Sequence, residues 1–194
     1  RKSPGSWDLM KTFWYLQALD NQAVVADSQV TAGFIINSDG VTGEISGSGG
    51  CNDYSATIGQ NFVIGPIQTT DNTCDAVPME QERIYLAALA TAYTYSLAGD
   101  QLLIPTANGV LLYRTQPPAK INFWADDEVI DEGQCTVVHW DVEHVQALWV
   151  YPQGEPYEDY PMTGQESRQV CPPTTTTFEM RVLLTDGNIA FRQL

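Results

Sequence analysis

Gly49-Gly50-Cys51-Asn52-Asp53-Tyr54, followed by Thr69-Thr70-Asp71-Asn72-Thr73-Cys74, are the stretches that decide the fold of the first half of this 194-residue chain. The glycine pair lets the backbone turn where a side chain would clash, and a second cysteine after an apolar strand can return to meet the first. We interpret Cys51 and Cys74 as a structural cross-link. The pattern requires no nucleophile.

The composition is that of an ordinary folded protein, with 43% hydrophobic and 17% charged residues. The formal net charge of −15 should repel nucleic acid, so we expect no nucleic-acid partner. Solubility is the simplest role for this charge. The acidic cluster Asp126-Asp127-Glu128 with Asp131-Glu132 lacks the alternating ligands and central glycine of a calcium loop. We expect a solvated loop there and neither a metal nor a cofactor.

Features that bear on location favour an oxidising compartment. No apolar stretch approaches the roughly 20 residues that cross a bilayer, and residues 1–6 lack the apolar core of a signal peptide. The protein is therefore either cytosolic or exported by a segment outside this sequence. Four cysteines, two in each half, favour export. A zinc site would need Cys-x-x-Cys spacing or nearby histidines, and neither pair has them.

Short alternating strands with glycine turns fill the region before about residue 115. An apolar run over 12–19 suggests a buried first strand, and Asp39-Gly40 between 33–36 and 41–45 is a hairpin signal. Gly99-Asp100 and Asn108-Gly109 predict further hairpins. These turns imply an antiparallel meander.

One segment, Met79–Ala90, has the composition of a helix. It follows Pro78 and carries Glu80 and Glu82 in what we expect to be its first turn, where the helix dipole favours negative charge. It should be the only substantial helix. Its many apolar residues predict that it covers the sheet.

The hairpin spacing stops at two prolines, which are typical of a linker between domains. We expect a first domain over residues 1–115, a linker over 116–118 and a second domain over 119–194. Within the second, strands are predicted over 121–124, 135–142, 147–151, 175–184 and 189–191. Thr136, Val138, Trp140 and Val142 should share one face of their strand. The pattern predicts a small sandwich.

The first half resembles the META domain, the family that includes HslJ-type proteins of the bacterial envelope, from about Trp7 to Arg114. The resemblance rests on Thr12–Leu16, the Gly-Gly-Cys-Asn motif, Ile64-Gly65-Pro66 leading to Cys74, the helix, Gly99–Leu102 and Leu111–Tyr113. Lys11 and Asp71-Asn72-Thr73 depart from the usual family residues. The second half resembles a bacterial immunoglobulin-like sandwich, through Gln134-Cys135, Trp140-Asp141-Val142 and Cys171-Pro172-Pro173.

These resemblances imply a mainly β protein: an antiparallel β-barrel-like domain with one helix, then an immunoglobulin-like sandwich. They also imply an exported or lipid-anchored protein of the bacterial envelope, associated loosely with stress or drug tolerance. No catalytic residue is established for the META domain, so none is carried over.

Pairing within each half is the economical choice for the cysteines, giving Cys51–Cys74 and Cys135–Cys171. In the chain-entropy model each bridge would contribute about 3–4 kcal/mol. Cys135 should face away from Trp140, so its bridge would close an end of the sandwich and not span its core.

A search for catalytic residues finds little. The serine in Gly47-Ser48-Gly49 lacks the Gly-x-Ser-x-Gly context of a nucleophile elbow. His139 is best explained as an outward strand residue, and His144 lies near it. Paired carboxylates could run glycoside chemistry, but no spacing singles out a pair. We expect no enzyme.

Binding is the more reasonable class. Trp149, Tyr151, Tyr157 and Tyr160 alternate with prolines, and exposed aromatic residues favour interfaces and carbohydrate contacts. Tyr157 and Tyr160 are therefore binding candidates, although such rings can also fill a core. The leading hypothesis is a non-catalytic envelope protein with a protein or polysaccharide partner. The alternatives are a barrel holding a small ligand in a cavity lined by Trp14, Phe34 and Tyr95, a protease inhibitor, and a hydrolase fragment.

Overall fold

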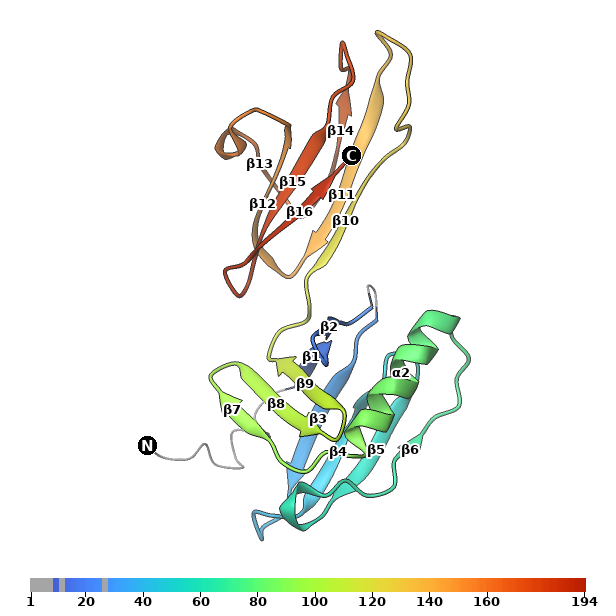
Figure 1. Cartoon of the computed structure of the whole chain (residues 1–194), viewed down its shortest axis with the longest axis vertical. Helices are drawn as coiled ribbons and strands as arrows, with labels where there is room; N and C mark the ends of the chain where they lie inside the picture. Colours follow the sequence, from blue (N-terminus) through green and yellow to red (C-terminus); the bar gives the residue numbers. More distant parts are fainter. Residues whose placement is uncertain (1–8, 11–12, 26–27) are drawn as a thin grey trace. The chain divides into compact units, whose positions relative to one another are not determined.

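The computed structural model describes residues 9–10, 13–25 and 28–194 of the chain (Figure 1). The chain divides into two compact units, and the boundary along the chain falls between Pro118 and Ala119. We call them the first and the second unit and describe each by itself.

One antiparallel sheet forms the framework of the first unit. Its order is β6-β5-β4-β3-β1-β9-β8-β7, and β2 pairs with β1. The bounds are β1 Trp14–Leu19, β2 Gln22–Ala23, β3 Thr31–Ile36, β4 Gly43–Ser48, β5 Asp53–Ile58, β6 Gln68–Thr69, β7 Ser96–Ala98, β8 Gln101–Thr106 and β9 Gly109–Arg114. The hairpins predicted at Asp39-Gly40, Gly99-Asp100 and Asn108-Gly109 all form, and each joins two neighbouring strands of this sheet.

The sheet consists of two meanders joined through β1. Strands β3 to β6 form one meander and β7 to β9 the other, while β1 pairs with β3 on one side and β9 on the other. Among the described residues the end strands β6 and β7 do not pair, so the predicted barrel-like domain is an open sheet. The predicted antiparallel meander would have placed every strand beside its neighbour in sequence, whereas here β1 lies between β3 and β9.

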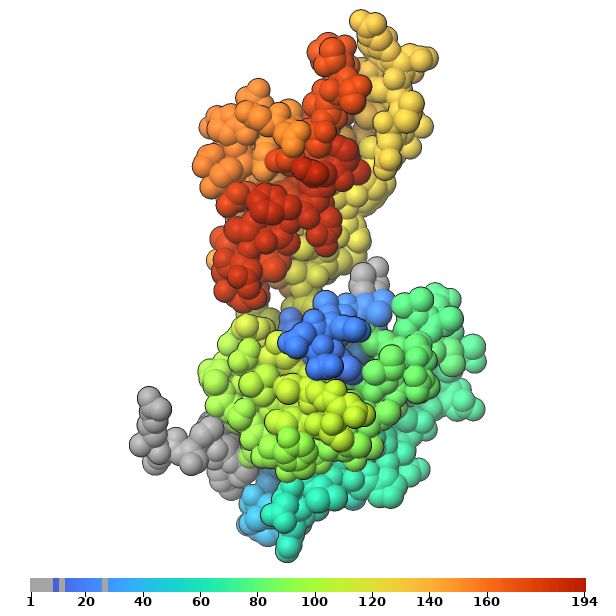
Figure 2. Space-filling view, in the orientation of Figure 1, coloured from blue at the N-terminus to red at the C-terminus, as the bar shows by residue number. Residues whose placement is uncertain are grey.

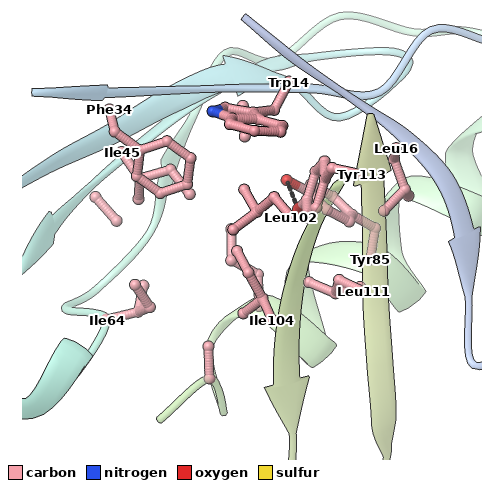
Figure 3. Close-up of a cluster of buried hydrophobic side chains, with 14 of the residues drawn as sticks. Trp14, Leu16, Phe34, Ile45, Ile64, Tyr85, Leu102, Ile104, Leu111 and Tyr113 are labelled. Atoms are coloured by element: carbon pink, nitrogen blue, oxygen red, sulfur yellow. Dashed lines mark hydrogen bonds between the residues drawn. The ribbon is translucent and has the colours of Figure 1, made fainter. Parts of the chain in front are cut away.

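A single hydrophobic core lies inside the curl of this sheet (Figure 3). Ile45 of β4 and Leu102 of β8 belong to one buried cluster, although their strands stand far apart in the sheet order. The ring of Phe62 lies 6.3 Å from Phe34 and 5.0 Å from Tyr95, measured between centroids. The two meanders therefore bend toward each other around shared apolar side chains.

Helix α2 covers the core and spans Ala76–Leu89, three residues earlier than predicted. Pro78 lies inside the first turn, where the missing N–H costs nothing because first-turn N–H groups have no partner within the helix. The prediction that Glu80 and Glu82 occupy the first turn is therefore wrong. Tyr85, Ala88 and Leu89 are buried, as the expectation of a core-covering helix requires.

Two antiparallel sheets form the second unit, in the orders β10-β11-β14 and β13-β12-β15-β16. The bounds are β10 Lys120–Ala125, β11 Thr136–Glu143, β12 Val145–Pro152, β13 Pro161–Met162, β14 Gln165–Val170, β15 Phe178–Leu184 and β16 Ile189–Gln193. Short 3₁₀ turns occur at Gln60–Phe62 and Tyr157–Asp159. The alternation predicted for β11 is confirmed, because Val138, Trp140 and Val142 are buried in the core between the sheets.

Candidate functional site

The Gly-Gly-Cys-Asn turn binds a carboxylate of helix α2. The backbone N–H groups of Cys51 and Asn52 donate to Oε2 of Glu82 at 3.1 and 2.6 Å, and the side-chain Nδ2 of Asn52 donates to Oε1 at 2.8 Å. Both Asn52 and Glu82 are 8% exposed. The carboxylate therefore satisfies three donors, and the two from Asn52 would otherwise be buried without acceptors.

Gly49 and Gly50 lie so close to neighbouring side chains that neither position has room for a Cβ atom. A Cβ at Gly49 would lie 2.6 Å from Oε2 of Glu82. Gly50 has a φ of +107°, and a Cβ there would lie 2.5 Å from the hydroxyl of Ser28. A side chain at either position would push the turn away from the helix.

Asn52 extends this network to the segment that carries the second cysteine. Its Oδ1 accepts hydrogen bonds from the Thr70 hydroxyl at 3.0 Å and from the Asn72 backbone N–H at 2.6 Å. Cys51 and Cys74 are joined with a Cα–Cα distance of 5.9 Å. The predicted disulfide is confirmed, so the sulfur of this turn serves as a cross-link and not as a thiol nucleophile.

A chain of three buried tyrosines crosses the same core. The Tyr113 hydroxyl donates to that of Tyr85 at 3.0 Å, and Tyr85 lies 2.6 Å from the Tyr54 hydroxyl. Tyr54 donates its only hydroxyl proton to the carbonyl of Thr31 at 2.9 Å, so Tyr85 must be the donor toward Tyr54. Burial raises the pKa of all three phenols above the ordinary value. They are neutral hydrogen-bonding groups, not bases.

Gln81 completes the connections from α2. Its Oε1 accepts from the backbone of Val25 at 2.5 Å, and its Nε2 donates to the Ser28 hydroxyl at 2.7 Å. Successive helix residues thus fix separate segments of the first unit. Among the described residues no buried side-chain nitrogen or oxygen lacks a partner. The arrangement is a completed structural network.

The second disulfide joins two neighbouring strands. Thr136 and Val170 are paired in register, and Cys135 and Cys171 lie one residue beyond them with a Cα–Cα distance of 4.1 Å. The bridge therefore closes the end of the β11–β14 pair within one sheet. This pairing confirms the predicted disulfide, and it differs from the inter-sheet bridge of antibody domains.

Tyr157 sits on the outer face of the other sheet. Its ring meets Trp149 edge-on at 5.4 Å and lies 6.3 Å from Tyr151, while the Arg181 guanidinium stands 4.3 Å above its centre. The same guanidinium lies 5.3 Å from the ring of Phe191. Tyr160, the other binding candidate, instead lines a cavity of the second unit. The two tyrosines thus belong to different places.

Below these rings the sheet carries polar groups. Oε1 of Glu179 accepts hydrogen bonds from Nε2 of Gln153 at 3.0 Å and from Nε2 of Gln193 at 2.9 Å. The hydrogen bond from Gln193 is the main cause of a lowered pKa of Glu179, with Tyr151 and Gln153 contributing. Sequence reasoning missed Arg181, Glu179 and Phe191, because only strand pairing places Arg181 between Trp149 and Phe191, and Glu179 between Tyr151 and Gln193.

His139 is the residue nearest to a catalytic arrangement. Its Nε2 lies 2.8 Å from Oδ1 of Asp126, its ring stacks on Trp124 at 5.1 Å, and Ser167 stands opposite it on β14. In a Ser-His-Asp triad the histidine Nε2 faces the serine and Nδ1 bonds to the aspartate. Here Nε2 bonds to Asp126, so it is not available to Ser167. The group also lies on the surface of a sheet. It fits a surface pair, in line with the outward position predicted for His139.

The cavity proposed for a small ligand in the barrel has no counterpart at the predicted residues. Trp14 and Phe34 are 2% and 5% exposed and belong to the packed core (Figure 3). Tyr95 packs against this core. None of the described cavities is lined by these three residues. Packed side chains occupy the space that the ligand would need.

Within the described part of the chain, no group of three or more His, Cys, Asp or Glu side chains is placed to hold a metal ion. No helix in that part has the length and apolar character needed to cross a membrane.

Comparison with known proteins decides the family of the first unit. The model of the META domain matches residues 7–119, more than half of the chain. The chain belongs to the META domain family. Of the two departures from the family pattern, Lys11 lies outside the described residues, and Asn72 bonds to the Gly-Gly-Cys-Asn turn. The match ends at residue 119, so the immunoglobulin-like identity of the second unit stays a prediction.

Two solved structures are similar to part of the chain. One NMR structure has 19% identity and a TM-score of 0.45, and the match covers 58% of this chain and 95% of that one. An NMR structure of a protein from Burkholderia xenovorans has 20% identity and a TM-score of 0.44, covering 60% and 93%. No curated protein matches the chain.

Proposed function

We propose that this protein is a non-catalytic, exported binding protein of the bacterial envelope. In this proposal the META domain is a cross-linked scaffold, and the second unit is an immunoglobulin-like module that binds a polysaccharide. A contribution to stress or drug tolerance would follow from attachment to the envelope polymer.

The strand order supports the immunoglobulin-like assignment. The sheet β10-β11-β14 corresponds to strands A, B and E of that fold, and β12-β15-β16 corresponds to C, F and G, with β13 as an added edge strand. Two disulfides support export, because such bonds persist mainly in oxidising compartments.

The observation that carries the binding proposal is the aromatic face, which we define as Trp149, Tyr157, Arg181 and Phe191. Trp149 pairs with Arg181 across β12 and β15, and Arg181 pairs with Phe191 across β15 and β16. Phe191 is 51% exposed. Large rings beside a cation on the outside of a sheet are unusual for a merely solvated surface, because charged and small polar residues cover most such faces.

Sugar chemistry fits this mixture of groups. A pyranose presents apolar C–H faces that stack on aromatic rings, and hydroxyls that need donors and acceptors at the edge. The aromatic face supplies the rings, and Gln153, Glu179 and Gln193 supply amide and carboxylate groups on the same sheet. Arg181 adds donors for sugar hydroxyls, and the net charge of −15 repels polyanions, so a neutral sugar is favoured.

Affinity electrophoresis of the full chain through gels that contain neutral or uronic-acid polysaccharides tests the proposal. Retardation should be strongest in the neutral polymer, because the net charge of −15 repels the uronic acids. Phe191→Ala and Arg181→Ala should each weaken it about tenfold, as expected for residues at the centre of a contact.

Matched controls separate this face from general stickiness. Trp124→Ala removes a ring that is 44% exposed on the other sheet, and Tyr93→Ala removes one that is 58% exposed in the META domain. Both controls should migrate as the parent protein does. Equal loss in all four variants, or no retardation by any polymer, would refute the proposal. Retention of a single envelope protein that depends on Phe191 would favour a protein partner.

A further inference from the structure

Two adjoining cavities open at one end of the second unit. Their volumes are about 570 and 390 Å³, within the usual range for small-molecule sites. Both are lined by Val138, Val170, Pro172, Pro173, Thr176 and Phe178. Because they share these six residues, we treat them as one space and call it the end cavity.

Apolar side chains form the inner wall of the end cavity. Val138 belongs to the buried core, and Val170 and Phe178 pack against it. The space therefore reaches the hydrophobic interior between the two sheets. An apolar body that entered it would lose contact with water on several sides.

The mouth of the larger cavity is strongly negative. Asp127, Glu128, Asp131 and Glu132 line it, all in the loop between β10 and β11, and all are exposed. Figure 2 shows this loop, in golden yellow, at the surface of the second unit. None of the four side-chain carboxylates bonds to another described residue. No lysine or arginine lines the larger cavity, and Arg168 lines the smaller one. At the mouth of the larger cavity no basic side chain of the lining offsets the negative charge.

Covalent constraints hold the walls in place. Cys135 ends the acidic loop, Cys171 begins the opposite wall, and the disulfide joins the two. Pro172 and Pro173 follow immediately and restrict that wall further. A site whose walls are fixed before binding loses less conformational entropy when a ligand enters.

We propose that the end cavity binds a small amphipathic cation, a molecule with an apolar body and an ammonium group. The apolar body lies against Val138, Val170 and Phe178, and the ammonium group stays at the mouth among the four carboxylates. This site is separate from the aromatic face, so its function stands or falls independently of polysaccharide binding.

Charge selects the ligand class. An anionic amphiphile of the same shape would bring its head group against four unpaired carboxylates, whereas a cation is attracted to them. The side chain of Val129, 91% exposed, adds apolar surface beside the carboxylates at the same mouth. A chain that is apolar close to its ammonium group matches this combination.

Calorimetric titration of the full chain with decyltrimethylammonium, below its micellar concentration, tests the proposal. Decyl sulfate, with the same tail and the opposite charge, should bind at least about tenfold more weakly. Added salt should narrow the difference because the carboxylates are exposed to solvent. In NMR spectra, the cation should shift the resonances of Val138, Val170 and Phe178.

Two sets of substitutions with equal change in net charge locate the site. The variant D127N/E128Q/D131N/E132Q should lose about tenfold in affinity for the cation. The variant E155Q/E158Q/D159N/E166Q changes four exposed acids that do not line either cavity, and it should bind as the parent does. Equal loss in both variants would mean that the cation follows net charge, and would overturn the proposal.

A third variant tests the cavity itself. Thr176 lines both cavities and is partly buried, so Thr176→Phe should fill the space and abolish binding of decyltrimethylammonium. A melting curve checks that this variant folds. If it does not fold, NMR of the parent protein decides, because cation-induced shifts confined to residues outside the end cavity would also refute the proposal.

Discussion

The two disulfides of this protein lie in contrasting surroundings. Cys51 belongs to a turn whose backbone is bound by the buried carboxylate of Glu82, and the partner segment is tied to the same turn through Asn52. Cys135 and Cys171 join neighbouring strands beside a cavity, and both are exposed. Cys51–Cys74 is therefore part of a buried hydrogen-bond network, whereas Cys135–Cys171 joins two walls of the end cavity.

The two disulfides therefore have different structural roles. In the META domain the network around Glu82 already orders the turn, and the bridge adds to it. In the second unit the buried core is smaller, and the bridge limits the movement of the walls of the end cavity. The hydrogen-bonding groups around Glu82 are used within the protein, whereas the exposed carboxylates at the mouth of the end cavity are open to a ligand.

The disulfides themselves provide the largest test. Replacing either pair by serine should lower the free energy of unfolding by about 3–4 kcal/mol in the chain-entropy model. The second unit should lose the larger share of its stability, because its core is smaller. Differential scanning calorimetry of C51S/C74S and C135S/C171S measures both. A larger fall in melting temperature for C51S/C74S would contradict the comparison.

Loss of the Glu82 carboxylate is the next largest effect. Glu82→Ala leaves three donors of Cys51 and Asn52 without this acceptor, two of them buried, so it should destabilise the META domain by about 3 kcal/mol. Urea denaturation measures this cost. Glu80→Ala on the same helix removes only an exposed pair with Arg83 and should leave the unfolding curve nearly unchanged.

The direction of the tyrosine chain gives a smaller, ordered pair of effects. Tyr54→Phe removes both the acceptor for Tyr85 and the donor to Thr31, and should cost about 2 kcal/mol. Tyr113→Phe removes only the donor at the start of the chain, and should cost about 1 kcal/mol. Equal costs in denaturant titrations would mean that the hydroxyls do not form a directed chain.

The smallest expected effect concerns the titration of Glu179, which lies on the same sheet as the aromatic face. The pKa of Glu179 is lowered by its hydrogen bonds, first of all with Gln193. The ionised carboxylate therefore stabilises the second unit above the ordinary glutamate pKa, and this contribution is lost as the pH falls through the lowered value. NMR titration should show the low midpoint in the parent protein and a higher one in Gln193→Ala. An unchanged midpoint would rule out Gln193 as the main cause.

Local signals in the sequence were sufficient for much of this architecture. The Asp-Gly and Asn-Gly turns, the alternation in β11, the presence of one helix and the cysteine pairs all depend on neighbouring residues or simple spacing. The helix began earlier than expected because Pro78 fits within a first turn as well as before one. Strand β14 was missed because Gln165–Val170 is polar on both faces, and its pairing with β11 alone makes it a strand.

The sequence by itself determined that the protein is mainly β, that its cysteines pair within each half, and that its first half resembles the META domain. Only the tertiary structure decided that β1 joins two meanders, that Glu82 binds the Gly-Gly-Cys-Asn turn, and that Arg181 lies over Tyr157. The physical reason is the separation along the chain of the residues that interact. Turns and alternation arise from adjacent residues, whereas these contacts join groups far apart in the chain, which only the packing of the sheets brings together.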